Sequence, residues 1–126
     1  MYEVGIVGHF EAAHQLHGDF GPACRLHGHT YRVEVVVRGP EIDASGVLLD
    51  IGSLQERLAT CLAELHYQNL ADVPSLRHTN TTAETMARFI WQQVTSDWTA
   101  PAETTVQVRV WESAAVFGGY ESVVTS

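Results

Sequence analysis

The chain has 126 residues, a length that suits a single domain, 1–126, and leaves little room for a second. Hydrophobic residues make up 45% of it and charged residues 17%, which argues against an intrinsically disordered protein. Its net charge of −8, from 15 acidic and 7 basic residues, argues against nucleic acid or an anionic membrane surface as the main partner.

The first third of the chain predicts two strands joined by a loop. Residues 2–14 alternate loosely between apolar and polar side chains and indicate a strand that ends at His14. Glycine and proline then mark a loop over 17–24. Residues 31–38 are β-branched and alternating, and they form the clearest strand pattern of the chain.

Two amphipathic helices are predicted in the middle of the chain. Over 53–66 the apolar residues recur at helical spacing, and Ser53 is a suitable N-cap. A second apolar stripe over 82–98 follows Thr81 and Thr82, either of which can cap a helix.

Strand patterns return at the end, over 105–111 and over 116–124, the latter interrupted by Gly118 and Gly119. The predicted order is therefore ββααββ. Strands on either side of a helix pair indicate an α+β domain in which both helices lie on one face of an antiparallel sheet.

The two cysteines lie in different surroundings. Cys61 belongs to the apolar face of the first helix and is expected in the core. Cys24 lies in the loop before the second strand, so a disulfide between the two is not expected. The start of the sequence has no basic segment followed by an apolar one, and no stretch is long enough to span a membrane, so we expect a cytoplasmic protein.

Three histidines are placed so that their rings can meet. His27 and His29 open the second strand and, at positions i and i+2, project from the same face. His14 closes the first strand, and the intervening loop lets the two strands form a hairpin. Three imidazoles with an open fourth position are typical of catalytic zinc. The alternative is three unrelated histidines bonded to backbone carbonyls.

Two further residues, Cys24 and Glu112, can each be interpreted either as part of a functional site or as a residue without a chemical role. Cys24 could be a fourth metal ligand, a free thiolate near the metal, or an inert loop cysteine. Glu112 follows the 105–111 strand, and its carboxylate suits recognition of an amino-pyrimidine edge because it accepts two hydrogen bonds. It could equally be an exposed glutamate at a strand end.

Five motifs occur in order and carry a family resemblance. They are Phe10-Glu-Ala-Ala-His14, Cys24-Arg-Leu-His27-Gly-His29-Thr-Tyr31, Leu49-Asp50-Ile51, Asn80-Thr-Thr-Ala-Glu84 and Trp111-Glu112-Ser113 through Tyr120. Together they resemble the 6-pyruvoyl tetrahydropterin synthase family, especially its bacterial 6-carboxytetrahydropterin synthase branch. The resemblance spans nearly the whole chain. It implies a T-fold, whose subunit sheets join into a β-barrel in homo-oligomers, typically trimers paired into hexamers with sites at the interfaces.

The resemblance also implies the members of the site. The implied Zn2+ ligands are His14, His27 and His29; the implied substrate-binding residues are Glu112, Glu84 and Asp50; the implied catalytic cysteine is Cys24. A helix-start electrostatic role for Glu84 is equally credible. In such enzymes the substrate is 7,8-dihydroneopterin triphosphate, and zinc makes C–H protons of its side chain acidic. A thiolate and a histidine shuttle protons, and triphosphate or a two-carbon aldehyde departs. The product of the 6-carboxy branch serves queuosine-type deazapurine synthesis.

The chain departs from the family pattern in two places. Only two residues separate Cys24 from His27, where the branch commonly has three. In place of an Asp-His pair the chain has His66 and Tyr67 before Asn69, which makes these two the candidate catalytic partners of the cysteine; His78 could also substitute.

Two other functions therefore stay open. One is a three-histidine zinc hydrolase acting on a pterin-like ring. The other is a non-catalytic pterin-binding or zinc-binding oligomer.

Overall fold

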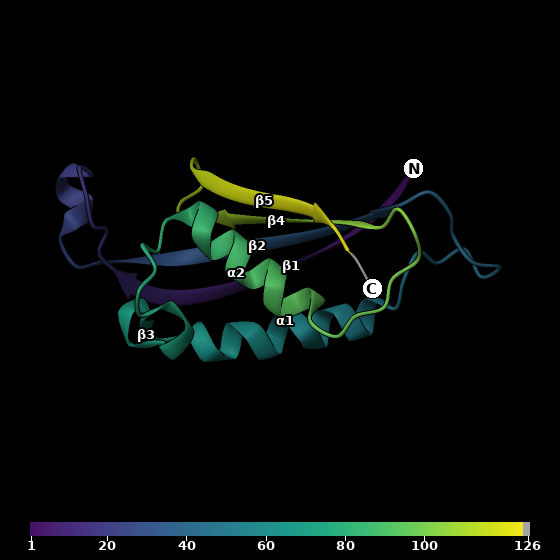
Figure 1. Ribbon diagram of the computed structural model, residues 1–126, viewed down its shortest axis with the longest axis horizontal. Helices are drawn as coiled ribbons and strands as arrows, with labels where there is room; N and C mark the ends of the chain where they lie inside the picture. Colours follow the sequence, from purple (N-terminus) through teal and green to yellow (C-terminus); the bar gives the residue numbers. More distant parts are fainter. Residues whose placement is uncertain (125–126) are drawn as a thin grey trace.

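The computed structural model describes residues 1–124 and shows one five-stranded sheet and two helices (Figure 1). The strands are β1 (Tyr2–His14), β2 (His27–Gly39), β3 (Gln68–Asn69), β4 (Thr105–Trp111) and β5 (Phe117–Val123). The helices are α1 (Ile51–Leu65) and α2 (Ala83–Thr95), and three short 3-10 helices are η1 (Gly21–Cys24), η2 (Leu70–Asp72) and η3 (Pro74–Leu76). The strand order is β3-β1-β2-β4-β5, with only β3 parallel to its neighbour. No helix within residues 1–124 is long and apolar enough to cross a membrane.

Both helices cover the same face of the sheet, as the alternation of the strands predicts (Figure 1). Helix α1 packs against β1, while α2 packs against β4 and β5. The core between them is formed by alternate strand residues such as Phe10, Tyr31 and Val33, all fully buried, and by the apolar stripes of the helices. The predicted α+β class with a ββααββ order is thus confirmed, and β3 is an addition.

The helix boundaries correct two predictions. Helix α1 begins at Ile51, and its N-cap is Asp50, whose carboxylate accepts a hydrogen bond from the Ser53 amide at 3.4 Å. Ser53 as N-cap is therefore wrong, because an aspartate three residues earlier already supplies an equally good cap. Helix α2 follows the predicted cap Thr82 but ends at Thr95 rather than at residue 98. The chain turns there, with Asp97 at a positive φ of 55°.

The strands and the cysteines agree more closely with the predictions made from the sequence. Strand β1 has the predicted bounds, and β2 starts four residues before the predicted 31–38 because the hairpin register continues to His27. Cys61 is buried in the core as expected, and neither it nor Cys24 forms a disulfide. Strand β3 escaped prediction because two residues are too few to show a period.

Candidate metal and ligand site

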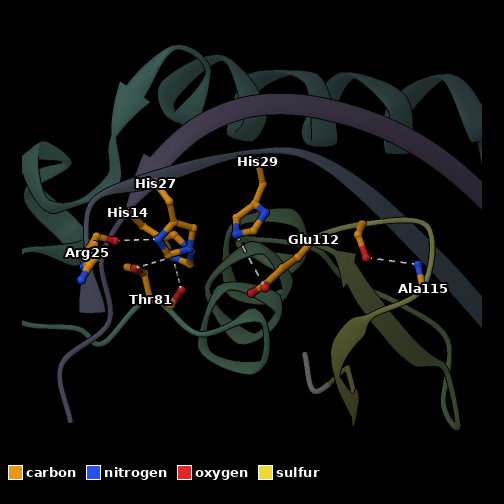
Figure 2. A network of polar contacts seen from close by, with 8 residues as sticks. His14, Arg25, His27, His29, Thr81, Glu112 and Ala115 are labelled. Atoms are coloured by element: carbon orange, nitrogen blue, oxygen red, sulfur yellow. Dashed lines mark hydrogen bonds and ion pairs between the residues drawn. The ribbon is translucent and has the colours of Figure 1, made fainter. Parts of the chain in front are cut away.

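The register of the β1–β2 hairpin brings the three histidines together. His14 pairs with His27, and Ala12 pairs with His29, so all three rings point to the helix-covered face of the sheet. Their ring centroids lie 4.5 Å (His14–His27), 5.1 Å (His14–His29) and 4.9 Å (His27–His29) apart (Figure 2). One nitrogen from each ring lies within 4.8 Å of the other two, a grouping that could hold a metal ion. The structure thus confirms that the spacing of these residues makes a cluster.

Two of the rings are fixed through their second nitrogen. The Nδ1 of His14 donates to the main-chain oxygen of Thr81 at 2.9 Å, and the Nδ1 of His27 donates to that of Arg25 at 2.7 Å. A carbonyl oxygen can only accept, so in the neutral form of each ring the proton lies on Nδ1 and the lone pair on Nε2. This arrangement is the usual one around a bound metal, because it orients the ring and raises its basicity.

The residues of the cluster fit a metal ion. His14 is 1% exposed, and its Nε2, like that of His29, is buried without a hydrogen-bond partner among the described residues. An unpaired buried nitrogen is costly, and a metal ion would satisfy both. Burial, followed by the neighbouring His27 and His29, lowers the pKa of His14 below its ordinary value of 6.5 despite the hydrogen bond to Thr81. The ring is therefore neutral at pH 7, which is the form that binds metal.

Glu112 approaches the cluster from the other side. It lies one position beyond β4, on the same face as the buried residues of that strand. Its Oε2 lies 3.7 Å from the Nε2 of His29 (Figure 2). The ring centroid of Tyr31 lies 5.2 Å from that of His29, and the Tyr31 hydroxyl is buried without a partner in residues 1–124. Burial and the charge of Glu112 raise the pKa of Tyr31, so its hydroxyl remains a donor. A residue with an acceptor, Glu112, and a residue with a donor, Tyr31, thus both adjoin His29.

The start of α2 forms another wall of the site. Thr81, which holds His14, precedes the helix, and Glu84 lies exposed in its first turn. Strand β5 passes so close that a Cβ on Gly118 would lie 2.8 Å from both the amide nitrogen and the Oε1 of Glu84. Glycine is needed there because any side chain would push the helix start away from the sheet.

Cys24 does not join the histidines. It ends η1, and its Sγ donates to the main-chain oxygen of Gly18 at 3.1 Å. Within residues 1–124 the group of potential metal ligands comprises the three histidines without it, so the fourth-ligand alternative has no support in this geometry. The cysteine is tied to the site through its neighbour Arg25, whose carbonyl orients His27.

The candidate residues of the α1–β3 junction lie at the edge of the sheet. The Nδ1 of His66 accepts a hydrogen bond from the amide of Glu11 at 3.0 Å. Tyr67 adopts a positive φ of 57° and is 76% exposed, and its amide donates to the carbonyl of Glu11. Hydrogen bonding to the Glu11 carboxylate, followed by the charge of that group, raises the pKa of Tyr67.

Asp50 is not brought to the histidines within one chain. It caps the start of α1, whereas the end of that helix adjoins Glu11, three residues before the His14 end of β1. Fifteen residues of α-helix separate the two ends, a length of about 22 Å at 1.5 Å per residue. His78 lies exposed in the segment before α2.

Sequence reasoning did not identify Thr81, the Arg25 carbonyl or Tyr31 as parts of the site. Each falls inside one of the family motifs, but the main-chain acceptors of Thr81 and Arg25 leave no trace in residue type. Tyr31 could have been noticed as the third member of the alternating series that begins with His27 and His29.

Comparison with known proteins finds a matching family and several relatives. The model of the family described as 6-pyruvoyl tetrahydropterin synthase matches residues 3–122. A 6-pyruvoyl tetrahydrobiopterin synthase of Drosophila melanogaster is 32% identical over 118 residues, covering 82% of this chain and 70% of its own length. A 6-carboxy-5,6,7,8-tetrahydropterin synthase of Haemophilus influenzae is 26% identical over 149 residues, covering 96% of this chain and 99% of its own.

Among solved structures, the 6-pyruvoyl tetrahydropterin synthase of Caenorhabditis elegans superposes with a TM-score of 0.84 at 25% identity. The superposition covers 96% of this chain and 95% of that one. The fold expected from the resemblance is therefore confirmed for the subunit.

Proposed function

This chain belongs to the 6-pyruvoyl tetrahydropterin synthase family, and we propose that it is a zinc-dependent lyase of the 6-carboxytetrahydropterin synthase type. The proposed reaction converts 7,8-dihydroneopterin triphosphate and water into 6-carboxytetrahydropterin, a two-carbon aldehyde and triphosphate, within deazapurine biosynthesis. The observation that carries the proposal is the cluster of three histidines, two of them oriented by main-chain carbonyls, beside the carboxylate of Glu112.

His14, His27 and His29 would hold the zinc ion. Once bound, zinc supplies a Lewis acid that polarises the oxygens of the substrate side chain and acidifies the adjacent C–H bonds. The carbonyls of Thr81 and Arg25 keep two of the imidazoles turned toward the ion.

The pterin ring would be held between Glu112 and Tyr31. A carboxylate accepts two N–H bonds from an amino-pyrimidine edge, and the buried hydroxyl of Tyr31 can donate to a ring heteroatom. Glu84 at the start of α2 is proposed to close this side of the pocket. Asp50 could bind substrate only in a site shared with another copy, because it lies at the far end of α1.

Proton transfer is assigned to Cys24, His66 and Tyr67. Cys24 lies in the loop that holds His27 and is proposed as the acceptor of the C–H proton. His66 and Tyr67 are exposed at the sheet edge, and they would serve a site shared with a second copy. We accordingly propose one domain, 1–126, in a cytoplasmic homo-oligomer, a trimer or a hexamer, whose sheets join into a barrel.

The direct test is to incubate the purified zinc-loaded protein with 7,8-dihydroneopterin triphosphate and to identify products by liquid chromatography and mass spectrometry. We expect 6-carboxytetrahydropterin together with the aldehyde. No new pterin from fully loaded protein would overturn the proposal. A product of ring hydrolysis that still forms in Cys24→Ala would indicate the zinc hydrolase instead.

One observation favours a second candidate, a pterin-binding protein without turnover. The Nδ1 of His66 already accepts the Glu11 amide, so its remaining nitrogen carries a proton and cannot act as a base in the same tautomer. Tight pterin binding that Glu112→Gln abolishes, with no product formed, would support this candidate.

A further inference from the structure

A cavity of about 270 Å3 adjoins the metal site and has no role in the preceding proposal. It opens between the β1–β2 loop and the segment that leads into α2. Its lining consists of His14, Gln15, His17, Ala71, Arg77, Thr79 and Thr81. Since small-molecule pockets start at about 300 Å3, the cavity suits one group of a ligand rather than a whole ligand.

The polar side chains of this cavity are rich in donors. Arg77 supplies five N–H groups, Gln15 supplies an amide, and Thr79 supplies a hydroxyl, while no aspartate or glutamate lines the cavity. Arg77 forms no ion pair within 4.0 Å in the described part of the chain, although acidic residues outnumber basic ones 15 to 7. Arg25, Arg57, Arg88 and Arg109 likewise have no ion pair there, so it is the place of Arg77 in a cavity without carboxylates that suits it to an anionic ligand.

The two walls of the cavity are held together before any ligand binds. The amide of His17 donates to the Oδ1 of Asn80 at 2.9 Å, and the Nδ2 of Asn80 donates to the carbonyl of His17 at 2.9 Å. This pair of bonds fixes the loop against the segment before α2. The main chain of the two walls therefore needs little further ordering when a ligand binds.

The cavity and Glu112 reach the histidines from different sides. His14 and Thr81 belong both to the cavity wall and to the histidine cluster, whereas Glu112 contacts the cluster at His29 (Figure 2). A ligand with its ring at Glu112 and its middle at the histidines would therefore extend its far end toward Arg77.

We propose that this cavity is a subsite for a phosphate or polyphosphate group, with Arg77 as its main cation. The guanidinium fork matches two oxygens of such a group, and Gln15, His17 and Thr79 surround it with further donors. The assignment of this phosphate group to a pterin rests on the proposed function. The preference of the cavity for an anion is independent of the proposed function.

The test compares Arg77→Gln with Arg88→Gln, which removes the same charge from an exposed position of α2. Zinc-loaded protein is titrated with neopterin and with neopterin triphosphate by calorimetry. We expect Arg77→Gln to weaken binding of the phosphorylated probe about 10- to 100-fold and to leave neopterin unchanged, as a lost charge-assisted bond predicts. Arg88→Gln should bind both probes like the parent protein, and Arg77→Lys should recover part of the affinity.

Several outcomes would overturn the inference. Equal weakening of both probes, or no weakening, in Arg77→Gln would remove Arg77 from anion binding. If neither pterin binds, the proposed function fails, and titration with inorganic pyrophosphate then tests the cavity alone. Pyrophosphate binding that depends on Arg77 supports the subsite. Pyrophosphate binding that is unchanged in Arg77→Gln refutes a phosphate site, and so does a preference for oxalate that depends on Arg77. Because Arg77 is exposed, its replacement leaves the core intact.

Discussion

The Nδ1 of His14 lies 2.9 Å from the main-chain oxygen of Thr81, although the two residues are 67 positions apart in the chain. The Thr81 hydroxyl is a second partner at 3.2 Å. This contact joins the end of β1 to the start of α2, and it is what turns the Nε2 of His14 toward the other two histidines.

Thr81→Val and His14→Ala should therefore differ sharply in zinc binding. The valine variant keeps the main-chain acceptor of His14. We therefore expect its zinc affinity to fall by less than the roughly 10-fold that usually follows loss of a hydrogen-bond partner of a metal ligand. His14→Ala removes a ligand, and zinc should no longer co-purify at one ion per chain. Zinc content by mass spectrometry and competition with a chromophoric chelator measure both effects. His78→Ala, which removes an exposed histidine, is the control; zinc retained by His14→Ala would contradict the assignment.

Glu112→Gln should weaken pterin binding while zinc stays bound. The substitution preserves the size of the side chain but removes the charge and one acceptor. Loss of a hydrogen bond to a charged group lowers the binding free energy by about 1.5–3 kcal/mol. Fluorescence titration with neopterin should show an affinity about 10- to 100-fold lower. Glu56→Gln, on the exposed face of α1, controls for the change in net charge. An unchanged affinity in Glu112→Gln would remove this residue from the pterin pocket.

The cap of α1 can be tested with two substitutions. Asp50→Ala should lower the free energy of unfolding by about 1 kcal/mol because the Ser53 amide loses its acceptor. Ser53→Ala should change it by less than about 0.5 kcal/mol, since its side chain caps nothing. Urea denaturation followed by circular dichroism compares the two. A larger loss in Ser53→Ala would restore serine as the cap.

The two thiols should react at very different rates. Cys61 is 5% exposed, and burial raises its pKa to about 12, so at pH 8 it stays protonated and out of reach. Cys24 lies partly exposed in its loop. Ellman's reagent should therefore modify one thiol per chain in the native protein and two in guanidinium chloride. Two fast thiols in the native protein, or retention of the fast phase in Cys24→Ala, would contradict this assignment.

Much of this arrangement follows from local patterns in the sequence. Alternation predicts β1, β2, β4 and β5, and apolar stripes at helical spacing predict α1 and α2. Helix ends are less predictable, because Asp50 and Ser53 are both good caps and the pattern alone does not choose between them.

The sequence by itself determined that His27 and His29 share a face, because side chains two apart on a strand always do. The tertiary structure alone decided what surrounds them. It places Thr81 behind His14, separates Cys24 from the cluster, and sets Arg77 in a cavity beside it. These contacts join residues far apart in the chain, or main-chain atoms that every residue possesses, so no local pattern encodes them. They form when the core packs both helices onto the sheet.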